Sequence, residues 1–479
     1  MIEFLEPRIA PAGLIDVAFS RGNLVLKSLT GDAGDETATI TRNGVDGITI
    51  TPGANVAIRF EGTIFPISAP LALTGFSGKL TAKLGGGNDT LILDVGTYSS
   101  DVSIDLGDGA DTLEIRGGTV DFAGKLALSL GKGANQFTLA AADFHAAKGL
   151  TVNSGSGADL LIFKSAKLDI DGSLTVASGG GSDTVQFTSA IAELSVEKNF
   201  TIAASGSRSA SIEQSLAGLG KIDIGGKLTL SAGTGDRVQQ VLSGTIGTLT
   251  IGGDVAFSAT NPTEHTQVLA GGGALGGSLR MTTRALTGTQ TFSATTGTLA
   301  GAVTLSGGTA VVLDFAGSIP KDLAITTAKN STANVTLSAA TIDGNVSIVT
   351  KDGFGLAASI AIQDVIIHGA LAVTGGIGAT TLKVNQADIA KTFTVALKDG
   401  ANRFLIEQEN QPGASIFRGA VKLTGGIDVD TFTLGGTADN AIQFLATIIA
   451  DGKAGTDALT EGAASTHPVG LTTVKVSIP

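Results

Sequence analysis

The stretch LGGGNDTLILD, at Leu84–Asp94, is followed by four variants of itself, each a glycine-rich turn that leads into a short apolar run. The variants are LGDGADTLEI at Leu106–Ile115, LGKGANQFTL at Leu130–Leu139, SGSGADLLIF at Ser154–Phe163 and SGGGSDTVQF at Ser178–Phe187. Their polar turn residues follow one another at intervals of 22, 24, 24 and 24 residues and are Asp89, Asp111, Asn135, Asp159 and Asp183. A nearly fixed period of this length is typical of a solenoid repeat protein.

The period continues where the acidic turn is absent. Short segments of the form apolar–small–apolar recur about every 24 residues, from GLTV at Leu150 to GAVKL at Val421. Within them Leu150 and Val152 flank Thr151, an alternation that places apolar side chains on one face of a β-strand. No segment carries an apolar stripe at helical spacing. The sequence therefore predicts an all-β fold, a single-stranded parallel β-helix (β-solenoid) of about 18 coils with roughly 24 residues per coil and almost no helix.

The ends of the chain predict its division and its assembly. We expect an N-terminal lead-in or cap over residues 1–22, the solenoid over 23–460, and a C-terminal loop and terminal strand over 461–479. Both terminal segments, MIEFLEPRIA and LTTVKVSIP, are apolar at alternate positions, so neither resembles a strong cap. Uncapped solenoid ends present unpaired strand edges, which predicts head-to-tail self-association into filaments. Six phenylalanines that follow the corners are expected to stack inside: Phe137, Phe163, Phe187, Phe292, Phe404 and Phe432.

Composition excludes several classes of function. The 479 residues include no cysteine, so disulfides and thiolate metal sites are excluded. The net charge of −12 argues against nucleic acid as a partner, because phosphate binding needs clustered Lys and Arg. No stretch approaches 18 uninterrupted apolar residues, so we expect no transmembrane segment. The first 22 residues have neither a basic region nor an apolar core, so no classical signal peptide is visible.

The corner motif resembles a known family. The residues GGGNDTLIL at Gly85–Leu93 are similar to the glycine-rich calcium-binding repeats of RTX-type secreted bacterial proteins, whose pattern is G-G-x-G-x-D-x-U-x. The resemblance is partial, with weaker echoes at Asp428, Asp430 and Asp457. It implies a β-roll in which aspartate carboxylates and corner carbonyls bind Ca²⁺ between successive turns. The calcium ligands that it implies here are Asp89, Asp108, Asp111, Asp159 and Asp183.

A second interpretation of the same corner needs no metal. RTX repeats recur every nine residues, whereas this corner recurs every 24 or so, and Asn135 lowers the charge of the column. Glycine supplies the positive φ of a tight corner, and Asp or Asn hydrogen-bonds nearby backbone in a turn. Stacked coil upon coil, such residues form a polar ladder. The sequence leaves both a structural ladder and at least one calcium site open.

The sequence predicts no enzyme. The pectin-degrading and related β-helix enzymes place Asp clusters, a base and aromatic platforms on one outer face, but this chain has no Trp and a single Tyr, Tyr98. The four histidines are isolated, with no metal-ligand spacing, and are expected at the surface or at corners: His145, His265, His368 and His467. Asp236 and Arg237 are expected to lie near Glu264 and His265, one repeat later.

These observations favour a non-catalytic extracellular or cell-surface β-solenoid that acts as a structural or adhesive rod. Its expected partners are further copies of itself, end to end, or a cell-surface or matrix polysaccharide. The segment LEPRIAPAGL at Leu5–Leu14 resembles a stretch near the start of many large β-rich surface proteins of environmental bacteria. Two alternatives stay open: a calcium-dependent RTX-type secreted binding module, and a carbohydrate-active β-helix enzyme or tailspike-like protein.

Overall fold

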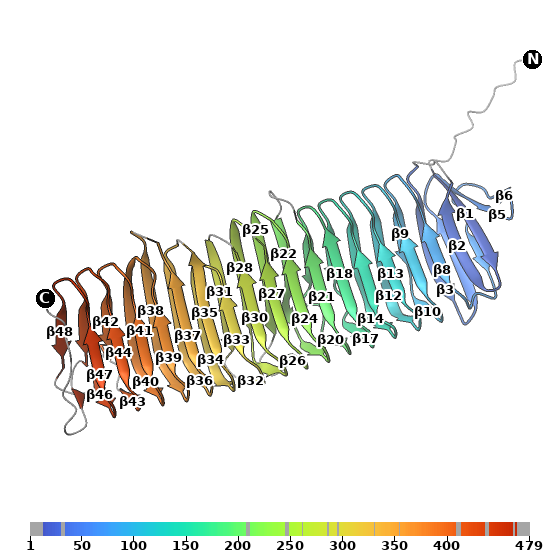
Figure 1. The fold of residues 1–479 in the computed structure, drawn as a ribbon. Helices are drawn as coiled ribbons and strands as arrows, with labels where there is room; N and C mark the ends of the chain where they lie inside the picture. The colour runs from blue at the N-terminus through green and yellow to red at the C-terminus, as the bar shows by residue number, and fades with distance from the viewer. Residues whose placement is uncertain are drawn as a thin grey trace, which may run out of the picture. The chain divides into compact units, whose positions relative to one another are not determined.

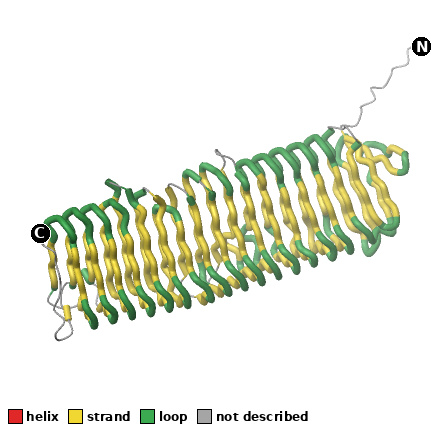
Figure 2. Tube along the Cα trace, in the orientation of Figure 1, coloured by secondary structure: helices red, strands yellow, loops and turns green. Residues whose placement is uncertain are grey.

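The computed structural model confirms the all-β prediction, with 64% of residues in strands and parallel sheets of about 24-residue spacing that form a β-solenoid. Figure 2 shows strands joined by loops in the part of the chain that the structure describes, without a helix. The structure describes residues 13–29, 34–206, 211–244, 249–260, 262–284, 287–294, 297–329, 331–353, 355–408, 413–435, 440–462 and 465–466. Within these ranges no helix is long and apolar enough to cross a membrane.

The chain divides into two compact units, Met1–Gly226 and Lys227–Pro479, and each contains two parallel sheets that we call sheet I and sheet II. In unit 1, sheet I contains β8 (Leu80–Lys83), β11 (Val102–Asp105), β13 (Leu126–Ser129), β15 (Leu150–Asn153), β18 (Leu174–Gly179) and β21 (Phe200–Ala204). Sheet II of unit 1 contains β9 (Thr90–Leu93), β10 (Gly96–Tyr98), β12 (Thr112–Phe122), β14 (Gln136–Ala146), β16 (Leu160–Phe163), β17 (Lys167–Ile170), β19 (Thr184–Phe187), β20 (Glu193–Val196), β22 (Ser211–Leu219) and β23 (Lys221–Ile224).

Unit 2 repeats this plan (Figure 1). Its sheet I contains β24 (Leu228–Ala232), β27 (Val255–Ala259), β30 (Leu279–Thr283), β33 (Val303–Ser306), β35 (Leu323–Lys329), β37 (Val346–Lys351), β39 (Leu371–Thr374), β41 (Phe393–Ala396), β44 (Val421–Thr424) and β47 (Ile448–Asp451). Its sheet II contains β25 (Arg237–Gly244), β26 (Leu249–Ile251), β28 (Glu264–Ala270), β29 (Gly273–Leu275), β31 (Thr287–Ala294), β32 (Gly297–Leu299), β34 (Ala310–Ile319), β36 (Ala333–Ile342), β38 (Ala357–Ile367), β40 (Ala379–Ile389), β42 (Arg403–Ile406), β43 (Gly413–Phe417), β45 (Thr431–Leu434), β46 (Asn440–Phe444), β48 (Ala458–Glu461) and β49 (Ser465–Thr466).

The first strands of unit 1 depart from the parallel repeat. They are β1 (Gly13–Ser20), β2 (Asn23–Ser28), β3 (Thr37–Asn43), β4 (Gly47–Pro52), β5 (Val56–Phe60), β6 (Thr63–Ile64) and β7 (Leu71–Leu73). The pairs β1–β2, β3–β4, β4–β7 and β5–β6 are antiparallel, and β2 and β3 then pair in parallel with β8 and β9. The outermost strands, β6 and β7, have only two and three residues, which leaves little unpaired edge.

These hairpins account for the difference in coil number. The structure has about 15 turns, whereas the sequence predicted about 18. The prediction divided the whole of residues 23–460 by one repeat length, but the segment up to β7 forms antiparallel hairpins rather than coils. Through β2 and β3 the hairpins pair with β8 and β9, the first strands of the parallel repeat. The predicted boundaries at residues 22 and 460 remain a prediction.

The interior is a stack of alternate side chains, as the period-two pattern predicts. In β13, Leu126 and Leu128 are buried and Ala127 between them is exposed. The predicted phenylalanine stacking is confirmed. The ring centroids of Phe163 and Phe187 lie 4.2 Å apart, and those of Phe404 and Phe432 lie 4.4 Å apart. Each coil therefore buries its apolar side chains against the coils next to it, and stability accumulates between neighbours.

Candidate functional site

The glycine-rich corners of successive coils in unit 1 stack into a column, and a side chain at the recurring glycines would have no room. Gly107 and Gly131 adopt φ values of 101° and 83°, in the region that favours glycine. A Cβ atom on Gly131 would lie 1.5 Å from the carbonyl oxygen of Gly107, and one on Gly107 would lie 1.7 Å from that of Gly85. The recurring glycines are thus required by the close approach of successive coils.

The polar residue of each corner forms a buried ladder, which we call the aspartate ladder: Asp89, Asp111, Asn135, Asp159 and Asp183, all 0–2% exposed. In each member Oδ1 accepts a hydrogen bond from a backbone N–H of the preceding coil. Oδ1 of Asp111 lies 2.7 Å from the nitrogen of Asp89, and Oδ1 of Asp159 lies 2.9 Å from that of Asn135. The ladder begins at Glu36, whose N–H donates to Asp89 at 2.8 Å. These side chains therefore link consecutive coils.

The second oxygen of each carboxylate has a different environment along the ladder. Oδ2 of Asp159 accepts from the Ser154 hydroxyl at 2.8 Å, and Oδ2 of Asp183 accepts from Ser178 at 3.0 Å. Oδ2 of Asp111 is buried and has no hydrogen-bond partner in the described part of the chain. An ionised carboxylate with an unpaired buried oxygen is costly, so this position favours a proton or a cation.

Burial also controls the protonation of the ladder. Loss of solvent raises the pKa of Asp89, Asp111 and Asp183 to about 6 in each case. It also raises the pKa of Asp159. Backbone N–H donors oppose this shift, and for Asp89 the charge of Asp111 adds to it. The ladder therefore takes up protons in mildly acidic solution.

The predicted calcium ligands are only partly brought together. Asp89, Asp111, Asp159 and Asp183 share one column, but Asp108 is exposed and pairs with Lys132 at 3.1 Å. Within the described ranges, no three His, Cys, Asp or Glu side chains form a group that could hold a metal. Calcium needs six to eight oxygens, and one oxygen of each ladder carboxylate already accepts a backbone N–H. The donor set fits a structural ladder better than a calcium shell.

A shorter ladder of the same kind occurs in unit 2, at the weak echoes of the motif. Oδ1 of Asp430 accepts from the nitrogen of Asn402 at 3.0 Å, and Oδ1 of Asp457 accepts from that of Asp430 at 2.9 Å. Asn402 in turn accepts from the nitrogen of Thr380. Asp428, two residues before Asp430, instead accepts from the exposed N–H of Gly400 at 2.7 Å.

Unit 2 also contains a buried ladder that the sequence analysis missed, which we call the glutamine ladder: Gln240, Gln267 and Gln290. Nε2 of Gln267 donates to Oε1 of Gln240 at 2.8 Å, and Nε2 of Gln290 donates to Oε1 of Gln267 at 2.9 Å. Each Nε2 also donates to a backbone carbonyl of sheet I, for example that of Thr282 at 3.2 Å from Gln267. The ladder therefore joins neighbouring coils and, within each coil, the two sheets.

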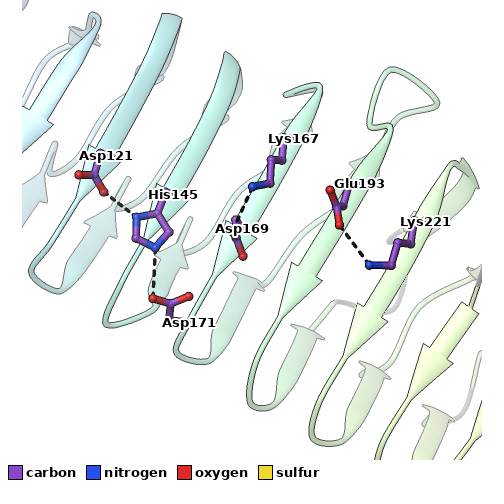
Figure 3. A network of polar contacts seen from close by, with 7 residues as sticks. All are labelled: Asp121, His145, Lys167, Asp169, Asp171, Glu193 and Lys221. Carbon is purple, nitrogen blue, oxygen red and sulfur yellow. Dashed lines mark hydrogen bonds and ion pairs between the residues drawn. The ribbon is translucent and has the colours of Figure 1, made fainter.

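An exposed polar network runs across sheet II of unit 1 (Figure 3). Nδ1 of His145 lies 2.6 Å from Oδ1 of Asp121, and its Nε2 lies 3.2 Å from Oδ2 of Asp171. Burial lowers the pKa of His145, but hydrogen bonds and charge from the two aspartates outweigh it, so the pKa is raised. Lys221 pairs with Glu193 at 3.2 Å. This histidine is thus not isolated, and its 24-residue spacing from Asp121 is the signal that could have revealed the pair.

The remaining predicted residues fall in different environments. Arg237 and Glu264 are register partners with Nε 3.9 Å from Oε2, as expected for neighbours. His265 is buried rather than exposed, and burial lowers its pKa. His368 pairs with Asp343 at 2.7 Å. His467 lies outside the described residues.

The fold and these ladders define a β-solenoid repeat protein. No protein-family model, curated protein or solved structure matches this chain. The similarity to RTX repeats therefore rests on the corner motif alone.

Proposed function

We propose that this chain is a non-catalytic extracellular or cell-surface β-solenoid that acts as a structural or adhesive rod. The observation that carries the proposal is the aspartate ladder, in which the most characteristic polar residues of the sequence hydrogen-bond the backbone of the neighbouring coil. Residues so committed stabilise a stack and are poorly placed to act on a substrate. The half-buried carboxylate of Asp121 and the exposed carboxylate of Asp171 likewise pair with the histidine between them.

A more specific version of this proposal is that copies of the chain associate end to end. The antiparallel hairpins and the very short β6 and β7 leave few unpaired backbone groups at the N-terminal end of unit 1. This arrangement speaks against strand-to-strand stacking at that end. Negative-stain images of the purified chain at rising concentration would show filaments if stacking nevertheless occurs.

Location and catalysis can be tested together with the native chain. An antibody against the chain should label intact producing cells as strongly as permeabilised ones, while a cytoplasmic marker is labelled only after permeabilisation. Purified chain incubated with a panel of acidic and neutral polysaccharides should release no reducing ends. Labelling confined to permeabilised cells would contradict the surface location, and release of reducing ends would contradict the non-catalytic role.

A calcium-dependent binding module is the second candidate, favoured by the unpartnered Oδ2 of Asp111. Its test is thermal unfolding in EDTA, in millimolar CaCl₂ and in MgCl₂ as a control. The structural ladder predicts the same melting temperature in all three solutions. A rise of several degrees in calcium alone, lost in Asp111→Asn, would establish the calcium site instead.

A further inference from the structure

A corner of unit 2 carries a row of cations without acidic partners. Arg284, Lys329, Lys351 and Lys398 are all exposed and lie at the ends of strands of sheet I. None of the four forms an ion pair with a described residue, although the chain has 43 acidic and 31 basic residues. Other cations of unit 2 do find partners, for example Arg418 with Asp388 at 2.6 Å.

The register makes this row unfavourable for stability. Lys329 and Lys351 are direct partners across β35 and β37. Neighbouring parallel strands lie about 4.8 Å apart, and like charges directly opposite each other destabilise a sheet. Strands β30, β33, β35, β37, β39 and β41 are consecutive (Figure 1), so Arg284 and Lys398 lie five strand spacings apart, about 24 Å. A repulsive row that gives the fold no benefit is best explained by a ligand.

Two neighbouring clefts lie at the same corner. A cleft of about 290 Å³ is lined by Arg284, Lys329 and Lys351, and a second cleft of about 530 Å³ shares both lysines and extends to Lys398. Between these cations the corner carries glycine: Gly307 after β33 and Gly376 after β39. A Cβ on Gly376 would lie 2.3 Å from the carbonyl oxygen of Asp352, so the close approach of the neighbouring coil requires glycine at this position.

Polar groups in the clefts point to a hydroxyl-bearing anion. The two clefts are lined by hydroxyl side chains that are half-buried or exposed: Ser306, Thr326 and Thr374. The one carboxylate lining the larger cleft, Asp352, is 4% exposed and accepts the N–H groups of Gly376 and Gly378 at 2.9 and 2.8 Å. That charge is thereby compensated, and the groove as a whole is cationic.

We propose that this corner is a binding groove for a linear acidic polysaccharide that carries carboxylates at regular intervals. The cations would meet the carboxylates, and the accessible hydroxyls of Thr326 and Thr374 would meet the sugar hydroxyls. Nucleic acid is less well matched, because no aromatic side chain lines either cleft for base stacking. This inference gives the proposed rod a ligand, and its reading as a groove that binds without cleaving rests on the proposed non-catalytic role.

The experiment measures binding of the full chain to polygalacturonate by titration calorimetry, with dextran and single-stranded DNA as comparison polymers. We expect binding to polygalacturonate that weakens as salt is raised, and little binding to dextran or DNA. The variant Lys329→Gln/Lys351→Gln should bind at least tenfold more weakly, with an unchanged or raised melting temperature because the repulsion is removed. The matched control is Lys321→Gln/Lys391→Gln, which removes two exposed lysines of unit 2 outside the clefts and should change affinity less than twofold.

The outcomes separate the two proposals. No binding, equal loss in both double variants, or stronger binding to dextran or DNA would overturn the groove and leave the rod intact. Binding accompanied by new reducing ends would overturn the non-catalytic role while the groove itself stands.

Discussion

Both units contain columns of buried polar side chains, but the side chains that form them differ. In unit 1 the column is aspartate, which when ionised only accepts hydrogen bonds, so each carboxylate depends on a backbone N–H of the preceding coil. Unit 2 has a shorter aspartate ladder of its own but also the glutamine ladder, whose amides both donate and accept, so Gln240, Gln267 and Gln290 hydrogen-bond one another directly. The aspartate ladder of unit 1 is titratable and requires a glycine corner, whereas the glutamine ladder is neutral and lies inside regular strands.

Because of this difference, the two ladders tolerate different substitutions. An aspartate ladder keeps its geometry when a member becomes Asn, as Asn135 shows by accepting from the nitrogen of Asp111 at 3.0 Å. A glutamine ladder loses a donor and gains a buried charge when a member becomes Glu. The neutral amide is therefore interchangeable with the acid in the aspartate ladder and not in the glutamine ladder.

The largest expected effect comes from the glycine corner. Gly131→Ala would place a Cβ 1.5 Å from Gly107 oxygen at a positive φ, so we expect a loss of more than about 3 kcal/mol of unfolding free energy. The matched control is Gly180→Ala, where the nearest atom would be 3.9 Å away and the expected change is below about 0.5 kcal/mol. Chemical denaturation measures both. Equal effects would mean that the corner relaxes and that close approach does not explain the glycine column.

Opposite signs are expected when charge is exchanged in the two ladders at pH 7.5. Gln267→Glu removes the donor to Gln240 and buries a carboxylate, which should cost about 3 kcal/mol. Asp111→Asn removes a buried charge and should leave stability unchanged or raise it by about 1 kcal/mol. Gln443→Glu, on the exposed side of β46, is the control for an added charge. Loss of stability in Asp111→Asn would show that the ladder needs the carboxylate itself, as a cation site would.

The parallel stack was predictable from sequence because a 24-residue period with alternate apolar residues leaves few other folds. The N-terminal hairpins were less visible, although Arg21–Gly22 and Asn43–Gly44 stand at turns between alternating strands, which is a hairpin signal. Gln240 occupies the inward phase between Val238 and Leu242, so alternation alone indicates its burial. What the sequence could not supply is which atom each ladder residue contacts, because that depends on the stagger between coils.

Mild acid should stabilise the aspartate ladder of unit 1. The folded-state pKa of Asp89, Asp111 and Asp183, about 6, exceeds the ordinary value of 3.8, so the folded chain binds more protons than the unfolded chain in this range. Stability from the aspartate ladder therefore rises as pH falls from 7.5 to 5, by about 1 kcal/mol per residue, and is lost as pH rises again. In unit 2, burial lowers the pKa of His265, which favours the neutral form and higher pH.

Thermal unfolding between pH 5 and 7.5 measures this dependence. The triple variant Asp89→Asn/Asp111→Asn/Asp183→Asn should flatten most of the profile, while Asp159 and His145, whose raised pKa values act in the same direction, still contribute. The control is Glu197→Gln, which neutralises an exposed carboxylate of unit 1 away from the ladder and should leave the profile unchanged. A wild-type melting temperature that falls steadily from pH 7.5 to 5 would contradict the raised pKa of the ladder.

The smallest expected effect is on the surface, where two histidines differ both in the number of their partners and in burial. His145 lies between two aspartates and its side chain is 35% exposed, whereas among the described residues the 56% exposed side chain of His368 pairs with Asp343 alone. His145→Gln should cost at most about 1 kcal/mol at pH 5.5 and less at pH 8, because the ion pairs require the protonated ring. His368→Gln should cost less than His145→Gln at pH 5.5. NMR titration of the His145 ring should give a pKa above 6.5, and a value at or below 6.5 would mean that burial outweighs the two carboxylates.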